Sequence, residues 1–167
     1  KAGEQQRVIV PLRLFVVAVA LVPILQAGPP GFVMWSAFEL AQRDAALSAR
    51  VGPDHSARET LADYGNPSGA HRFRFIHRDA DGIPEQHEHI EDVVFIKSGA
   101  GTLLVGGDMV NRTGSRGTGI KGGMRYSVGV GDMLHIPATT PHGYLVPDGG
   151  HITYVLVRVP AFVGQAP

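Results

Sequence analysis

The second half of the chain alternates between short hydrophobic runs and clusters of turn-forming residues. From Ala70 onward, Gly, Pro, Asp and Asn separate runs that are rich in Val, Ile, Phe and Tyr. The runs are HRFRFIH, DVVFIKS, GTLLVGG, RYSVGV, DMLHIPA, GYLVP and HITYVLVRVP. Regularly spaced short strands with turn signals are typical of a sandwich or closed barrel, not of βαβ units. We therefore predict an all-β domain over residues 67–160, followed by a tail at 161–167.

A helix is expected before the strands. Ser36 and Glu39 have the spacing of a capping box, in which each side chain satisfies a free backbone N–H at the start of a helix. The segment after them lacks Gly and Pro and keeps apolar residues at helical intervals, until Gly52-Pro53 ends it. This pattern predicts a helix over residues 37–50, within an N-terminal arm at 28–66.

The first hydrophobic stretch, from Leu14 to Leu25, differs from the others because basic residues precede it and small residues follow it. It is shorter than a membrane-spanning helix, and its flanks are those of a secretory signal. We predict that residues 1–27 are a signal peptide and that the protein is secreted or periplasmic. The alternative is that this stretch is a buried strand or helix of the fold.

A glycine-rich segment, residues 106–123, interrupts the strands. It is too polar for a core strand and carries Arg112, Arg116 and Lys121, so we expect a long loop at the rim of the barrel. In that position the three basic side chains are candidates for substrate binding. A flexible hairpin without a ligand is the alternative.

Composition narrows the function classes. A chain of 167 residues is long enough for one domain with a core of its own. Its 15 basic residues balance its 15 acidic residues, which disfavours a nucleic-acid partner and an anionic membrane surface. Because the chain contains no Cys, it has no disulfide, no thiolate zinc site and no iron–sulfur cluster. Any metal ion must therefore bind to nitrogen and oxygen ligands.

Three histidines form the strongest chemical pattern. His87 and His89 alternate, so on a β-strand both imidazoles point to the same side. The segment Gly131 to Pro137, and the turn after it, lead to His142. This residue supplies a third imidazole if the two segments pair inside one barrel. We predict a metal site formed by His87, His89 and His142.

The two segments resemble the motifs of the cupin family. The pair G-x4-HxH-x2-D-x6-G and GDMLHIPATTPH is similar to the cupin motifs G-x5-HxH-x3/4-E-x6-G and G-x5-P-x-G-x2-H-x3-N. The resemblance covers residues 70 to 160 and implies a cupin jelly-roll barrel with a short N-terminal helical arm. The chain departs from the motifs at Asp92, where the family has Glu, and at Val146, where it has Asn.

The shorter Asp92 side chain is expected to orient an imidazole or accept a proton rather than to bind the metal directly. Glu91 is the substitute, although its side chain should face away from the histidines. Tyr144 shares the alternation of His142 and is a further catalytic candidate, with a buried structural role as the alternative.

Three imidazoles with an open position predict a catalytic metal site. Nitrogen ligands and export together favour copper, with iron, manganese, nickel and zinc as alternatives. The resemblance extends to exported copper cupins that oxidise cellulose. We therefore predict an oxidoreductase that activates O₂ or H₂O₂ against a plant polysaccharide, with Trp35 available to stack on a sugar ring.

Two other functions stay open. One is a non-redox isomerase or lyase in which His135, Glu91 or Asp92 moves protons. The other is a barrel that binds a small ligand without turnover. A homodimer formed through the arm is the expected assembly.

Overall fold

The computed structural model describes residues 29–65 and 71–161. It divides into residues 1–34 and 35–167, and every helix and strand that it describes lies in the second unit. The segment predicted to be a signal peptide, residues 1–27, lies outside the described residues. In the described part of the chain, no helix is long and apolar enough to cross a membrane.

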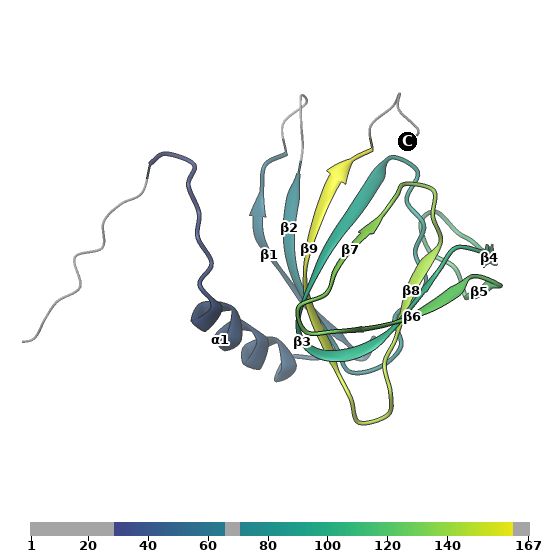
Figure 1. Cartoon of the computed structure of the whole chain (residues 1–167), viewed down its shortest axis with the longest axis horizontal. Coiled ribbons are helices and arrows are strands. Elements are labelled where there is room, and N and C mark those ends of the chain that lie inside the picture. Colours follow the sequence, from purple (N-terminus) through teal and green to yellow (C-terminus); the bar gives the residue numbers. More distant parts are fainter. Residues whose placement is uncertain (1–28, 66–70, 162–167) are drawn as a thin grey trace, which may run out of the picture. The chain divides into compact units, whose positions relative to one another are not determined.

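The second unit contains one described helix and nine described strands (Figure 1). They are α1 (Ala37–Ser48), β1 (Ser56–Asp63), β2 (Arg72–Arg78), β3 (Ile90–Val105), β4 (Asp108–Val110), β5 (Gly119–Lys121), β6 (Met124–Gly129), β7 (Met133–Ile136), β8 (His142–Leu145) and β9 (Ile152–Pro160). The predicted helix and the seven predicted runs all appear, which confirms the all-β barrel with a short helical arm. DVVFIKS and GTLLVGG join into the single long strand β3.

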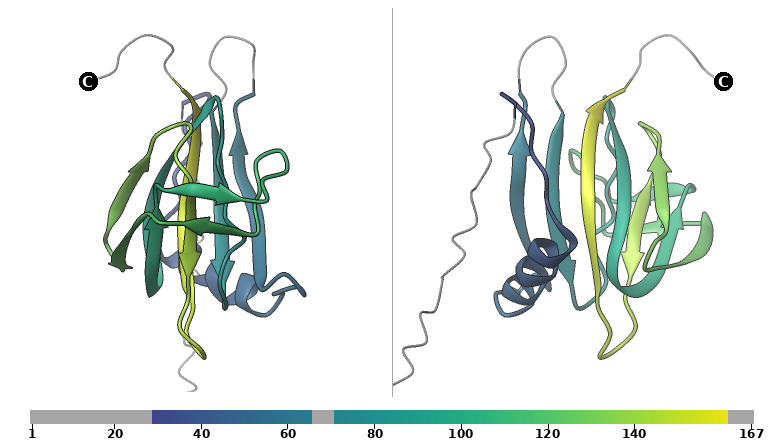
Figure 2. Two further views of the ribbon diagram at one scale, coloured as in Figure 1. Left: turned by 90° about the vertical axis from the view of Figure 1, so that its right-hand side faces the viewer. Right: turned by 60° about the vertical axis from the view of Figure 1, so that its left-hand side comes forward.

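Strand β3 links the two sides of the barrel. Its first part pairs with β9 and β7, and its second part pairs with β6 and β8, all antiparallel. The outer strands β2 and β1 extend the sheet beyond β9. In the right-hand view of Figure 2, β1, β2 and β9 lie on one side and β6 and β8 lie on the other.

The change of partner along β3 depends on a bend at its middle. The register with β9 shifts between Ile96 and Ser98, and Gly99 follows with a φ of 69°. A Cβ at Gly99 would lie 1.9 Å from the carbonyl oxygen of His151. Only glycine tolerates both this φ and this close backbone approach, so Gly99 allows β3 to turn from one side of the barrel to the other.

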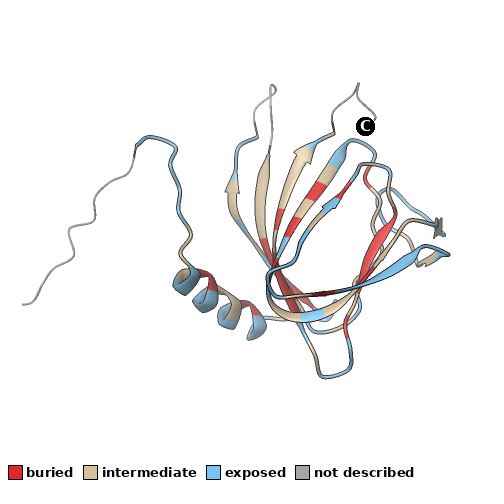
Figure 3. Ribbon diagram, in the orientation of Figure 1, coloured by how far each residue is buried: buried red, intermediate tan, exposed pale blue. Residues whose placement is uncertain are grey.

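Alternating side chains on the sheet form two hydrophobic clusters. The inner cluster fills the barrel and includes Val94, Ile96, Ile152 and Tyr154. The outer cluster joins Phe75 to Leu40 and Leu47 of α1. Figure 3 shows buried positions on the facing strands of the barrel and on one side of α1, as the strand and helix periodicities require.

A polar network, which we call the α1 anchor, holds the helix on the sheet. It consists of Asp44, His77, Ser98 and Thr153. Asp44 Oδ1 accepts from Thr153 Oγ1 at 2.7 Å and lies 3.1 Å from His77 Nδ1, and Asp44 Oδ2 accepts from the Ser98 hydroxyl. The N-terminus of α1 is capped by Ser36, whose side chain accepts from the Glu39 backbone N–H at 3.1 Å, whereas the Glu39 carboxylate accepts from the Arg43 guanidinium.

The structure differs from the prediction at two elements. The predicted arm includes Ser56–Asp63, but this segment forms β1 and pairs with β2 along its length. The glycine-rich segment is not a plain loop, because β4 and β5 pair within it as a short hairpin. Both β1 and this hairpin have few large apolar residues, and pairing with a neighbouring strand decides their conformation.

Candidate metal centre

The loop between β2 and β3 carries two site residues and runs beside β8. Glu85 and His142 exchange backbone hydrogen bonds of 2.8 and 2.9 Å, and the Gly82 N–H donates to the Tyr144 carbonyl at 2.8 Å. The backbone N–H of Thr139 donates to the His87 carbonyl. These contacts fix the loop at the barrel interior and bring Glu85, His87 and His142 together.

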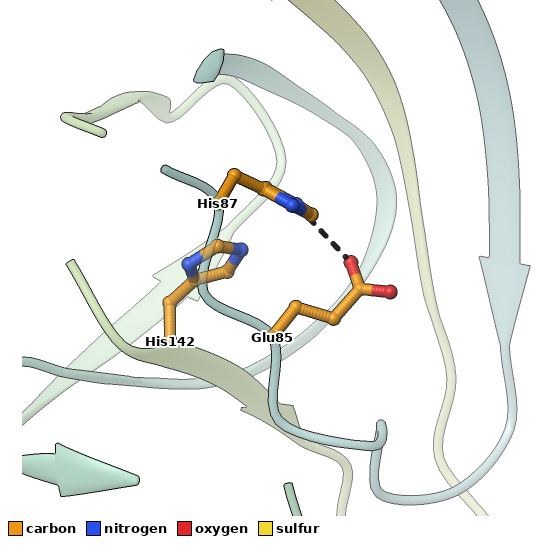
Figure 4. Close-up of side chains that lie close together, drawn as sticks. All are labelled: Glu85, His87 and His142. Atoms are coloured by element: carbon orange, nitrogen blue, oxygen red, sulfur yellow. Dashed lines mark ion pairs between the residues drawn. The ribbon is translucent and has the colours of Figure 1, made fainter. Parts of the chain in front are cut away.

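The three side chains point toward one another, as Figure 4 shows. Each offers one ligand atom, and the three atoms lie within 4.8 Å of one another. Glu85 Oε2 and His87 Nε2 are 3.6 Å apart. His87 is 9% exposed and His142 is 6% exposed, so bulk water does not compete freely for these groups. We refer to Glu85, His87 and His142 as the ligand cluster.

The orientation of His142 is set by its own turn. Its Nδ1 lies 3.0 Å from the Thr140 carbonyl oxygen, which can only accept a hydrogen bond. Nδ1 therefore carries the proton, and Nε2 keeps a lone pair that faces the cluster. Metal-binding histidines are typically oriented in this way by a carbonyl or carboxylate on the opposite ring nitrogen.

Asp92 and Arg158 complete the polar interior. Asp92 is 3% exposed, and its Oδ2 lies 3.4 Å from His142 Nε2 and 3.6 Å from His87 Nε2. Arg158 of β9 faces Asp92 of β3 in the sheet. Its guanidinium donates to Asp92 Oδ1 at 3.2 Å, Glu85 Oε2 at 3.0 Å and His87 Nε2 at 2.9 Å. One arginine therefore offsets the charge of both carboxylates.

These neighbours keep Glu85 ionised. Burial by itself would raise the pKa of Glu85, but the contact with His87 and the positive charge of Arg158 lower it to about 2. The Glu85 carboxylate is consequently available as an anionic ligand at any ordinary pH.

His89 does not join the ligand cluster. The chain bends at Glu88 and His89 before β3 begins at Ile90, so His87 and His89 do not share a strand. His89 is exposed and lines a separate cavity with His71 and Arg72. Glu85, two residues before His87, takes the position that the sequence analysis gave to His89.

This substitution brings the spacing between the paired ligands and Asp92 into line with the motif, although it shortens the spacer after Gly82 from four residues to two. If Glu85 stands for the first histidine and His87 for the second, four residues separate His87 from Asp92, within the three or four of the cupin motif. If His89 were the second ligand of the motif, only two residues would separate it from Asp92. Six residues then separate Asp92 from Gly99, as the motif requires. The first motif of this chain is therefore E-x-H-x4-D-x6-G.

The residues at the four motif positions (Glu85, His87, Asp92 and His142) converge inside the barrel. This chain has the cupin fold. No protein-family model and no curated sequence matches it.

Several solved structures are similar to this chain. A cupin 2 conserved barrel domain protein from Rhodopseudomonas palustris shares 24% identity over 66% of this chain, with a TM-score of 0.45, and the chain spans 63% of that protein. KdgF from Halomonas sp. shares 19% identity with this chain, and the match covers 67% of this chain and 85% of KdgF, with a TM-score of 0.47. The polyketide cyclase RemF from Streptomyces resistomycificus shares 18% identity with this chain. The match covers 68% of this chain and 75% of RemF, with a TM-score of 0.46. Similarity at these levels assigns no activity to this chain.

The remaining catalytic candidates take different positions. Tyr144 is buried, at 6% exposed, and lines a cavity beside Asp92 and His142. Glu91 points away from the interior, as its parity in the strand predicts, and its Oε2 lies 2.9 Å from His135 Nε2 on the outer side. Glu91 and His135 thus pair with each other and do not reach the ligand cluster.

The predicted substrate-binding residues are also separated. Arg116 Nε lies 3.7 Å from Glu85 Oε1, so the glycine-rich segment does reach the site. Arg112 pairs with Glu88 at the rim, whereas Lys121 lies exposed at the end of β5. Trp35 packs on Phe73, with ring centroids 5.2 Å apart, and joins the outer cluster, on the opposite side of the sheet from the ligand cluster.

The donor set fits a divalent metal ion. An ion about 2.1 Å from each ligand atom places neighbouring ligand atoms about 3 to 4 Å apart, a range that includes the distance from Glu85 to His87. Two imidazole nitrogens and one carboxylate oxygen suit iron, manganese, nickel, zinc and copper. Arg158 donates to two of the same ligand atoms, so a metal ion and the guanidinium compete for Glu85 and His87.

Proposed function

We propose that this cupin is a mononuclear metal-dependent oxidoreductase that uses dioxygen, with an ion bound by Glu85, His87 and His142. The convergence of these three ligand atoms inside the barrel, within 4.8 Å of one another, carries the proposal. Two histidines and one carboxylate with open positions are the donor set of non-haem iron(II) oxygenases.

The same donor set changes the preferred metal. The expectation of copper depended on three imidazoles and on export. Replacing one imidazole nitrogen by the Glu85 carboxylate oxygen gives a set of harder ligands, which favours copper less. Iron(II) is therefore the first choice, and copper, manganese, nickel and zinc are the alternatives. A bound redox-active ion would supply the electrons for the reaction with dioxygen.

The protein supplies a proton acceptor and a proton donor beside the ligand cluster. Asp92 faces both imidazoles, and Arg158 holds its other oxygen, so its carboxylate can take up a proton without leaving its position. Burial, followed by the nearby Tyr154 and Asp92, raises the pKa of Tyr144 well above 10. Tyr144 thus stays protonated and can donate a hydrogen bond to a substrate oxygen.

A non-redox isomerase or lyase is the second candidate, and Asp92 favours it. A buried carboxylate between two imidazoles can serve as a general base without any change of oxidation state. Activity that is unaffected by removal of oxygen would favour this candidate over the oxidoreductase.

The ligand assignment is tested by metal titration of the full chain after treatment with a chelator. The matched pair is Glu85→Gln and His89→Gln, because the two residues lie two positions on either side of His87. Loss of an outer partner of a metal ligand typically costs 10- to 100-fold in affinity. We expect Glu85→Gln to weaken Fe(II) and Mn(II) binding by about 100-fold and His89→Gln to have little effect. The opposite result would restore the original HxH assignment.

The reaction class is tested by oxygen uptake with the metal-loaded protein. Cellulose, which the resemblance favours, and small organic acids are the substrates to compare in the presence of a reductant. We expect oxygen uptake that depends on substrate and is lost in His142→Ala. Turnover at the same rate under nitrogen would overturn the oxidoreductase. Export and a homodimer stay predictions, and the ligand cluster depends on neither.

A further inference from the structure

A small cavity inside the barrel adjoins the ligand cluster and carries an excess of positive charge. Its volume is about 30 Å³. The charged residues of its lining are Arg58, Arg74, Arg78 and Arg158 against Glu85 and Asp92. Four guanidinium groups thus surround a space that contains two carboxylates.

The ion pairs of the described residues leave two of these arginines without an anionic partner. Arg158 is paired with both Glu85 and Asp92. Arg58 pairs with Asp54 at 2.7 Å. Within residues 29–65 and 71–161, neither Arg74 nor Arg78 forms an ion pair, and the buried Nε of Arg74 has no hydrogen-bond partner. The Nε of Arg78 donates to the neutral Tyr154 hydroxyl at 3.1 Å.

A third polar group of the cavity is also without a partner. The Tyr144 hydroxyl is buried and forms no hydrogen bond with any residue that the structure describes. The Tyr144 ring is stacked on Tyr154, with ring centroids 4.8 Å apart, so it cannot turn away without breaking this packing. A buried hydroxyl with no partner destabilises the empty cavity, and a ligand oxygen that accepts its hydrogen bond would remove this cost.

We propose that this cavity binds the carboxylate group of the substrate, with Arg74 and Arg78 neutralising its charge and Tyr144 donating a hydrogen bond to it. A water needs about 10–15 Å³ in such a cavity, so 30 Å³ accommodates about two or three non-hydrogen atoms, the size of a carboxylate. A phosphate group, with its central phosphorus and four oxygens, is larger. Binding of the carboxylate requires no metal ion. The proposal depends on the proposed function only because it treats the bound acid as the substrate.

Repulsion among the arginines gives independent support. Burial lowers the pKa of Arg74, and the neighbouring charges of Arg158, Arg72 and Arg58 lower it further. A carboxylate in the cavity would relieve this repulsion. Small carboxylic acids are therefore a better substrate class for this site than neutral cellulose.

The experiment titrates acetate into the chelator-treated full chain at constant ionic strength and follows backbone amide shifts by NMR. Acetamide, which has the same shape without the charge, is the matched ligand control. We expect acetate to bind in the millimolar range or tighter and acetamide to bind at least ten times more weakly. Hydrogen bonds to charged groups contribute about 1.5–3 kcal/mol, so Arg78→Gln and Tyr144→Phe should each weaken acetate binding by about 10- to 100-fold. Arg125→Gln, which removes an exposed arginine of β6, should leave it unchanged.

Equal binding of acetate and acetamide would overturn the proposal, and so would unchanged acetate binding in both Arg78→Gln and Tyr144→Phe. Tyr144→Phe keeps the ring and removes an unpartnered hydroxyl, so its result does not depend on whether Arg78→Gln folds. Tighter binding of inorganic phosphate than of acetate would contradict the carboxylate assignment. If the protein binds acetate but no metal ion, the proposed function is wrong and the carboxylate site is still supported.

Discussion

Two regions of this protein each place a buried histidine beside a carboxylate, and their surroundings differ. In the α1 anchor, Asp44 receives hydrogen bonds from Ser98 and Thr153 and also contacts His77, so protein groups satisfy its oxygens. In the ligand cluster, the ligand atoms of Glu85, His87 and His142 converge on one point. Among the described residues, Arg158 is the cation that contacts more than one of them.

The difference separates a structural polar network from a binding site. In the α1 anchor, hydroxyl donors from the strands meet the carboxylate of the helix, so the network is complete within the protein. In the ligand cluster, lone pairs are directed at one another, an arrangement that is stable only with a cation between them. A histidine–carboxylate pair is thus a candidate site when its remaining lone pairs converge, and burial alone does not make it one.

Arg158→Gln should produce the largest change and tests whether a cation is needed at the ligand cluster. Removing one partner of a buried ion pair typically costs about 3–5 kcal/mol, so we expect the metal-free variant to lose about 3 kcal/mol of unfolding free energy. Because Arg158 competes with the ion, added Fe(II) or Mn(II) should restore stability in the variant more than it raises that of wild type. Urea unfolding with and without metal measures both effects. A metal-free variant as stable as Arg125→Gln would show that the cluster needs no internal cation.

Asp44→Ala should come next and test the α1 anchor as a purely structural network. The change removes the carboxylate that accepts hydrogen bonds from Ser98 and Thr153 and contacts His77. We expect a loss of about 2 kcal/mol in unfolding free energy and no change in metal affinity. Glu39→Ala, which removes a more exposed carboxylate of the same helix, should cost less than about 1 kcal/mol. A fall in metal affinity in Asp44→Ala would show that the α1 anchor and the ligand cluster are coupled.

Acid unfolding should distinguish the two regions further. Burial would raise the pKa of Asp44, but the hydrogen bonds from Ser98, Thr153 and His77 lower it below its ordinary value of 3.8. A folded-state pKa below the unfolded one stabilises the fold above about pH 4 and loses that contribution as the pH falls through the folded value. Between about pH 4 and pH 2, wild type should therefore lose unfolding free energy more steeply than Asp44→Asn, as followed by circular dichroism in urea. Glu85 contributes in the same direction in both proteins, so parallel curves would mean that Asp44 has no role in the acid response.

Tyr144→Phe should have the smallest effect on stability. Because its hydroxyl is buried without a partner among the described residues, removing it should leave the unfolding free energy unchanged or raise it by up to about 1 kcal/mol. Thermal unfolding of the ligand-free protein measures this. A clear loss of stability would indicate that the hydroxyl has a hydrogen-bond partner in the protein, as the hydroxyls of the α1 anchor do.

Much of the fold could be predicted from local patterns. The capping box at Ser36 and Glu39 located the helix, and the apolar runs located seven strand segments, because both depend on neighbouring residues. Strand β1 could not be found in this way, since its sequence, SARETLAD, has few large apolar residues and owes its conformation to pairing with β2. The continuity of β3 was also missed, because Gly99 separates its two runs and a lone glycine in a sequence can mark either a turn or a bend within one strand.

The candidate site could be predicted only in part. His87 and His142 followed from spacing and type, and Asp92 was expected beside them without binding the metal directly. Glu85 was missed, although it has the same parity as His87 and His89 and the motif spacing to Asp92 favours it over His89. Arg158 gave no signal, because it lies in the last strand, far along the chain from the first motif.

The sequence by itself predicted that two histidine-bearing segments meet at this site with Asp92 beside them, because motif spacing and alternation along a strand are local properties. Only the tertiary structure decided which two of Glu85, His87 and His89 enter the barrel. That choice depends on the hydrogen bonds between Glu85 and His142 and on the bend at Glu88 and His89, which join or redirect segments far apart in the chain. Glu85, His87 and His89 have the same parity along the chain, so no periodicity could have revealed the choice.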